Sequence, residues 1–129
     1  LFLRNYKIKL LARLNKTIVF CEYIDSKNTP INPGKTFKLG PAGVNVKFFL
    51  PDFNQYFTNG CKKFIYEIFK ITEFSEEYED AIFAELNPSK KIQAEFTFYK
   101  TGKFKVKIYD SKKKNLLNSG TIIIKNTDI

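Results

Sequence analysis

The sequence has no histidine, no methionine and no tryptophan, and it has only two cysteines. The absence of histidine removes the commonest general base, the usual ligand of zinc and iron, and every Ser-His or Cys-His nucleophile pair. The phosphate-binding patterns GxGxxG and GxxxxGKS/T are also absent. We therefore expect a protein that is not an enzyme and that binds no cofactor.

Long apolar runs are missing too. No stretch of 18 apolar residues occurs, so we expect no membrane-spanning segment. The two cysteines, Cys21 and Cys61, leave two interpretations open. They could form a disulfide in an oxidising compartment. Alternatively Cys21, within the apolar run IVFCEY, is a small buried core residue.

The residues that are abundant are those of a β-rich core. The chain has 129 residues, of which 43% are hydrophobic, with 14 Phe and 7 Tyr. This length is that of one domain, residues 1–129, and it is long enough to bury a core of its own. Because the chain begins with leucine rather than methionine, we expect a processed product or a fragment of a longer protein.

Charge is unevenly distributed along the chain. The net charge is +9, yet six of the 13 acidic residues lie within residues 73–85. Nine of the lysines lie between Lys90 and Lys114. A molecule with an acidic lobe beside a basic face can steer charged partners or associate head to tail, so self-association is one expectation.

The clearest structural pattern lies between Ile92 and Lys125. Residues 92–98 alternate apolar with polar side chains, and residues 103–108 alternate lysine with Phe104, Val106 and Ile108. A period of two is typical of a strand with one buried and one solvated face. With the apolar residues 121–125, these segments predict three consecutive strands.

Other segments predicted to form strands are residues 17–24, 35–39, 44–50 and 61–71. Residues 6–14 also favour a strand by alternation, although a helix fits the spacing of Leu10, Leu11 and Leu14. Residues 61–71 are apolar on both faces, so we expect a second layer or a partner to cover each face.

Residues 73–86 leave two interpretations open. Phe74, Tyr78, Ile82 and Leu86 recur every fourth residue. Ser75 could cap a short helix near 75–86 that carries acids in its first turn. The alternative is a further strand over residues 81–86.

Seven or eight short strands with at most one short helix predict an all-β fold, a two-layer antiparallel β-sandwich. The segment from Phe98 to Ile108 (FYKTGKFKVKI) resembles the penultimate-strand signature of immunoglobulin-like domains. That signature reads aromatic, polar turn, Gly, x, Tyr, x, apolar, x, apolar. Two positions depart from it, since Phe104 replaces the tyrosine of the corner and Val106 stands at the disulfide cysteine. The resemblance implies an immunoglobulin-like β-sandwich like those of bacterial envelope and secreted proteins, and it implies no catalytic residue.

The function expected from these features is a non-catalytic interaction module of an exported or cell-surface protein. Its partner would be another protein or a neighbouring domain of the same chain. The candidate binding residues are those of a lysine stripe and loop, and two aromatics of the polar loop 54–59: Lys103, Lys105, Lys107, Lys112, Lys113, Lys114, Tyr56 and Phe57. The candidate acidic contact segment consists of Glu76, Glu77, Glu79 and Asp80.

Three alternatives accompany this expectation. The lysines could bind a polyanion, either nucleic acid or a sulfated glycan, although lysines on a solvated strand face also protect a sheet from aggregation. The acidic segment could hold Ca²⁺, but it lacks the spacing of a calcium loop, so we expect no metal. A hydrolase using two carboxylates would need a pocket that holds such a pair, and no pair is singled out by the sequence.

Overall fold

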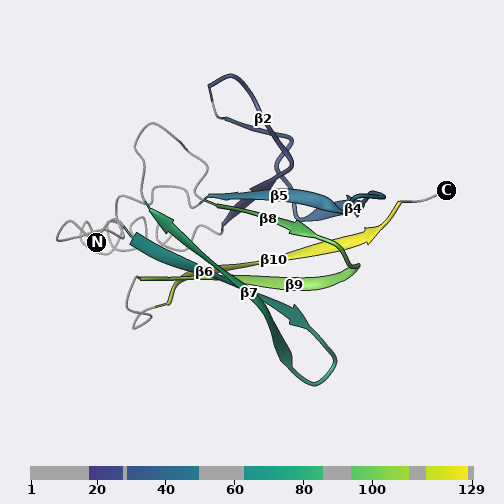
Figure 1. Ribbon diagram of the computed structural model, residues 1–129, viewed down its shortest axis with the longest axis vertical. Coiled ribbons are helices and arrows are strands. Elements are labelled where there is room, and N and C mark those ends of the chain that lie inside the picture. The colour runs from purple at the N-terminus through teal and green to yellow at the C-terminus, as the bar shows by residue number, and fades with distance from the viewer. Residues whose placement is uncertain (1–17, 28, 50–62, 86–93, 111–115, 128–129) are drawn as a thin grey trace, which may run out of the picture.

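The computed structural model describes residues 18–27, 29–49, 63–85, 94–110 and 116–127. These residues form strands and no helix, which confirms the all-β prediction (Figure 1). In chain order the strands are β1 (Val19–Cys21), β2 (Tyr23–Ile24), β3 (Pro30–Ile31), β4 (Thr36–Leu39), β5 (Val44–Phe49), β6 (Lys63–Ile71), β7 (Glu76–Glu85), β8 (Ala94–Phe98), β9 (Gly102–Asp110) and β10 (Leu116–Asn126).

The strands form two main sheets and a small hairpin. One sheet has the order β1-β5-β8 and the other the order β4-β10-β9-β6-β7, while β2 pairs with β3. Every pair is antiparallel except β4 with β10, which is parallel. The prediction of purely antiparallel sheets is therefore wrong at one edge, where the short strand β4 runs beside the last strand of the chain.

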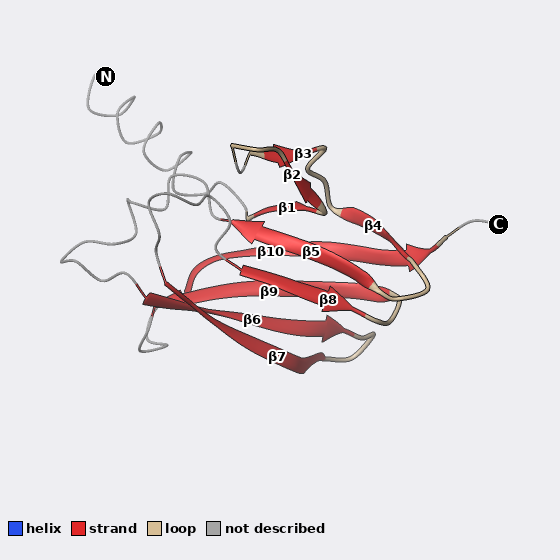
Figure 2. Ribbon diagram, turned by 45° about the horizontal axis from the view of Figure 1, so that its top comes forward, coloured by secondary structure: helices blue, strands red, loops and turns tan. Residues whose placement is uncertain are grey.

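The two main sheets pack face to face around one apolar core (Figure 2). Alternation decides which side chains enter it: on β9, Phe104, Val106 and Ile108 are buried, as the sequence predicts. Ring contacts join the sheets, with Phe48 of β5 5.7 Å from Tyr66 of β6 between ring centroids. Phe98 of β8 lies 4.8 Å from Phe104 of β9 by the same measure.

The short helix near 75–86 is a wrong prediction. Residues Glu76–Glu85 form strand β7, which pairs with β6 from Lys63↔Glu85 to Ile71↔Glu76. This strand contains most of the segment of the alternative interpretation, residues 81–86. Ser75 caps no helix, because its backbone N–H donates to Thr72 Oγ1 (3.0 Å) in the turn between β6 and β7.

A β-bulge interrupts the regular pairing of β7 with β6. Ile68 lies opposite Asp80 and Phe69 lies opposite Tyr78, so Glu79 is an extra residue on β7. An extra residue shifts the side chains beyond it to the other face of the sheet. A spacing of four fits both a helix and a regular strand, so it does not distinguish them, and the bulge places Tyr78 and Ile82 on opposite faces of the sheet.

Several expectations concern residues outside the described ranges. They are the strand at 6–14, the aromatics Tyr56 and Phe57, the lysines Lys112, Lys113 and Lys114, and Cys61. Cys21 is described, and it is a buried free thiol. In the parts of the chain described here, no helix has the length and apolarity needed to cross a membrane.

Candidate interaction surface

The side of the five-stranded sheet that faces away from the three-stranded sheet, called here the outer face, brings some of the predicted site residues together. The strand registers place its side chains in rows across β7, β6 and β9. One row contains Phe83, Ile65 and Tyr109, and another contains Tyr78, Phe69 and Lys105. The lysine stripe therefore shares its surface with aromatic and aliphatic side chains.

Two of the predicted lysines, Lys105 and Lys107, form an ion-pair cluster with one of the predicted acids on the outer face. Glu76 of β7 lies 2.8 Å from Lys107 Nζ and 3.4 Å from Lys105 Nζ, measured from its carboxylate oxygens. Lys107 Nζ also lies 4.6 Å from the centroid of the Phe69 ring, a cation–π contact. Its side chain is only 20% exposed. The face expected to be solvated is thus partly covered by its own side chains.

These contacts shift the protonation equilibria of the cluster. The hydrogen bond from Lys107 lowers the pKa of Glu76 below its ordinary value of 4.5, and the two lysine charges add to this effect. The same hydrogen bond raises the pKa of Lys107. Both shifts mean that the charged forms are favoured together, so at neutral pH this carboxylate offsets part of the charge of the lysine stripe.

Replacing Glu76 by glutamine is expected to remove part of the dependence of stability on acid pH. A lowered pKa in the folded state contributes stability above the unfolded-state pKa, and that contribution is lost as the pH falls through the folded-state value. At neutral pH the variant should therefore unfold at a lower urea concentration than the parent chain. This difference in urea midpoint should disappear at acid pH. Urea midpoints measured across this pH range provide the test. Glu77→Gln is the control, because Glu77 forms no ion pair with a described residue. A difference in urea midpoint that is equally large at acid pH would contradict the ion-pair explanation.

The remaining predicted acids point to other surroundings. Glu79, at the bulge, pairs with Lys100 at 3.3 Å. Asp80 Oδ1 accepts a hydrogen bond from the backbone N–H of Ala81 (2.7 Å). Among the residues described, no three Cys, Asp or Glu side chains gather where they could hold a metal ion. The acidic contact segment is consequently spread along an edge strand and is not a cluster.

Apolar side chains that the site prediction had not named complete the outer face. Tyr78 is 59% exposed, Phe83 is 80% exposed and Ile123 of β10 is 43% exposed, while Phe69 and Ile71 are half-buried. The signal that could have found them was the apolar character of both faces of residues 61–71. Exposed aromatic and aliphatic side chains on one face are typical of a protein–protein contact.

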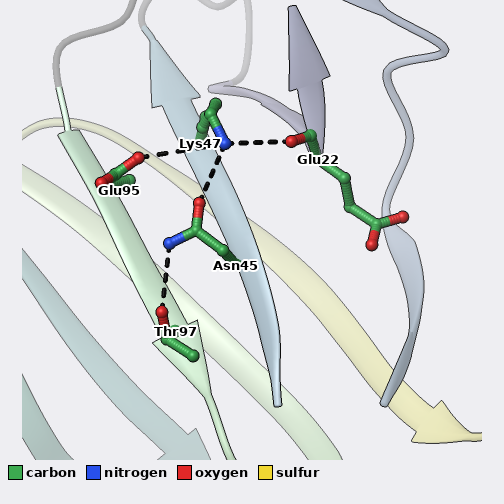
Figure 3. Close-up of polar contacts among 5 residues, drawn as sticks. All are labelled: Glu22, Asn45, Lys47, Glu95 and Thr97. Atoms are coloured by element: carbon green, nitrogen blue, oxygen red, sulfur yellow. Dashed lines mark hydrogen bonds and ion pairs between the residues drawn. The ribbon is translucent and has the colours of Figure 1, made fainter. Parts of the chain in front are cut away.

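The opposite side of the molecule carries a polar network of a different kind (Figure 3). Lys47 Nζ donates to the backbone oxygen of Glu22 and to Asn45 Oδ1, each at 3.0 Å, and lies 3.9 Å from the carboxylate of Glu95. Asn45 Nδ2 donates to Thr97 Oγ1 at 3.1 Å. The polar contacts between β5 and β8 join residues that are directly opposite each other in the register. The network therefore stabilises the three-stranded sheet.

Cys21 lies directly opposite Lys47 in this sheet. Burial raises the pKa of its thiol, and the neighbouring lysine charge opposes that change only in part. A thiol that is buried and protonated is a poor nucleophile. The interpretation of Cys21 as a small buried residue therefore agrees with its surroundings.

A hollow of about 390 Å³ lies at the start of the β6–β7 pair. Its lining consists of Lys63, Phe64, Ile65, Phe83, Ala84 and Glu85. Among the described residues of this lining, Glu85 supplies the one carboxylate. In comparisons with known proteins, no family model and no curated protein matches the chain.

Proposed function

We propose that this chain is a non-catalytic domain of an exported or cell-surface protein, and that it binds another protein through its outer face. The observation that carries this proposal is the combination of exposed apolar side chains with a lysine–glutamate cluster already paired within the face. Burying the exposed apolar side chains favours binding, whereas burying the paired charges costs desolvation free energy, so the apolar side chains supply the affinity. The polyanion alternative gains no support here, since Lys105 and Lys107 are both bound to Glu76.

We further propose that the domain is an immunoglobulin-like β-sandwich. In immunoglobulin domains strands C, F and G form one sheet, strands A, B and E belong to the other, and variable-type domains add C′ beside C. The order β10-β9-β6-β7 corresponds to G-F-C-C′, and β1-β5-β8 corresponds to A-B-E. Phe104, at the place of the corner tyrosine, is buried against Phe98. An exported location rests on this likeness, and fractionation of the source cells tests it.

Exchanging two exposed residues of the outer face for serine is expected to abolish partner binding. The variant is Tyr78→Ser with Ile123→Ser, whose side chains are 59% and 43% exposed. Exposed aromatic and aliphatic anchors at an interface typically contribute about tenfold or more in affinity each. To measure binding, the chain is immobilised and exposed to an extract of the source, and bound proteins are chemically crosslinked to it. The amount of each retained protein is then quantified.

The chain offers a matched control on its small hairpin. Tyr23 and Ile31 are directly opposite each other in β2 and β3 and are 67% and 41% exposed. Tyr23→Ser with Ile31→Ser therefore removes the same side chains from another surface. A protein retained by the parent chain and by this control, and lost from the outer-face variant, supports the proposal. Equal retention by both variants, or none by the parent chain, would refute it.

A further inference from the structure

Strand β7 is an edge strand. It pairs with β6 on one side, and no described strand pairs with it on the other, so it is the last described strand of its sheet (Figure 2). It is ten residues long. The free edge of a strand presents alternate N–H and C=O groups that can hydrogen-bond an added strand, and natural proteins protect such edges.

The negative charge of β7 determines which kind of strand can pair with it. Residues 73–85 contain six carboxylates and no lysine or arginine, in a chain with a net charge of +9. In a fully overlapped antiparallel pair of two β7 strands, Glu76 would lie opposite Glu85 at both ends, and like charges directly opposite each other are unfavourable. Glu77 and Glu85 form no ion pair with a described residue, so no described side chain competes for them with an incoming basic strand.

The hollow beside β7 adds a second element of recognition. It lies at the Glu85 end of the strand, and Phe83, 80% exposed, forms part of its lining. Strand addition commonly combines backbone hydrogen bonds with a pocket that takes one side chain of the added strand. In antiparallel addition the residue opposite Glu85 is near the N-terminus of the incoming strand, because β7 runs from Glu76 to Glu85.

We propose that β7 accepts an extended strand of a partner protein by antiparallel addition. The strand carries lysine or arginine opposite the carboxylates of β7 and an apolar or aromatic residue near its N-terminus that fills the hollow. This inference rests on the proposed function as a protein-binding domain and names the chemistry of one partner segment. The acids of β7 then serve both to prevent self-pairing and to select the partner.

Synthetic peptides added to the 129-residue chain test the proposal. The probe is a labelled ten-residue peptide in which lysine alternates with valine after an initial phenylalanine. We expect saturable binding by fluorescence anisotropy, at least about tenfold weaker when glutamate replaces every lysine, since opposite charges across strands attract and like charges repel. Replacing the initial phenylalanine by serine should also weaken binding. Equal binding of the lysine and glutamate peptides would overturn the proposal.

Backbone methylation separates strand addition from simple charge attraction. Two further peptides carry N-methyl groups on complementary sets of alternate residues, so that one set faces β7 and the other faces away. One of the two should lose binding by more than about tenfold, because several backbone hydrogen bonds disappear together. The other should bind like the unmethylated probe. If both bind equally, no strand is added and the proposal falls.

Charge reversal on the protein completes the experiment. Glu77→Lys should lower the affinity for the lysine peptide about three- to tenfold and raise the affinity for the glutamate peptide. Glu22→Lys, with the same change of charge near the other sheet, should leave the peptide preference unchanged, and urea unfolding checks that both variants are folded. A dimer that forms without peptide and is broken by Glu77→Lys would overturn the proposal in favour of a second copy. If no peptide binds while Tyr78→Ser with Ile123→Ser still loses its partner, only this inference fails.

Discussion

Replacing Gly120 of β10 by valine is expected to destabilise the domain by about 2–3 kcal/mol, the upper range of the cost of overpacking a core. A Cβ atom at Gly120 would lie 2.9 Å from Cε2 and 3.0 Å from Cζ of the Phe20 ring. Phe20 is buried in β1, so its ring must shift within the packed core to admit a larger side chain. The absence of a side chain at Gly120 therefore lets the two sheets approach each other at this point. The measurement is the urea midpoint, with the slope of the transition checked for a change in the unfolded state.

Two comparisons isolate the steric cause. Thr121→Val changes the next residue of β10, whose side chain points to the outer face opposite Lys105, and it should shift stability by less than about 0.5 kcal/mol. Phe20→Leu in the Gly120→Val background should recover part of the loss, giving a coupling of about 1 kcal/mol in a double-mutant cycle. Additive losses in that cycle would show that the valine acts through something other than the Phe20 ring.

The strands that could be predicted from sequence are those whose burial follows one period throughout. On β9 the alternation of Phe104, Val106 and Ile108 with lysines holds from end to end, because the strand is regular and lies between two partners. On β7 the bulge at Glu79 breaks the period, and pairing with β6 overrides the local helical spacing. A bulge changes side-chain direction without any mark in a single sequence, so residues near Tyr78 could not be assigned to a face in advance.

The candidate site was predictable in its parts and not in its arrangement. Lys105, Lys107 and Glu76 were all named as contact residues, but their pairing depends on β7 lying two strands away from β9. The order of strands in a sheet is set by tertiary packing, and residue spacing does not reveal it. The same limit hid the approach of Phe20 to Gly120, which lies 100 residues further along the chain. Tertiary packing between distant segments accordingly decides both the ion pairs of the outer face and the approach of Phe20 to Gly120.

Truncation of Phe48 to alanine is expected to cost about 3–5 kcal/mol, a large share of the stability of a domain of this size. Phe48 is fully buried, and its ring lies 5.4 Å from that of Phe20 and 5.7 Å from that of Tyr66, between centroids. Its removal leaves a cavity where the two sheets meet, because Phe20 is on the same sheet and Tyr66 is on the other. Urea unfolding measures the loss, and Phe48→Leu should reduce it to about 1 kcal/mol by refilling most of the space.

Phe83→Ala provides the contrast that separates folding from binding. The same change of side chain at a position that is 80% exposed removes almost no core contact, so stability should change by less than about 0.5 kcal/mol. Phe83 nevertheless lines the hollow at the end of β7, and its loss should weaken the lysine peptide. If Phe83→Ala destabilised the domain as much as Phe48→Ala, the outer face would be part of the core and could not serve as a free binding surface. The opposite result, a stable domain with weakened binding, assigns the buried phenylalanine to the fold and the exposed one to recognition.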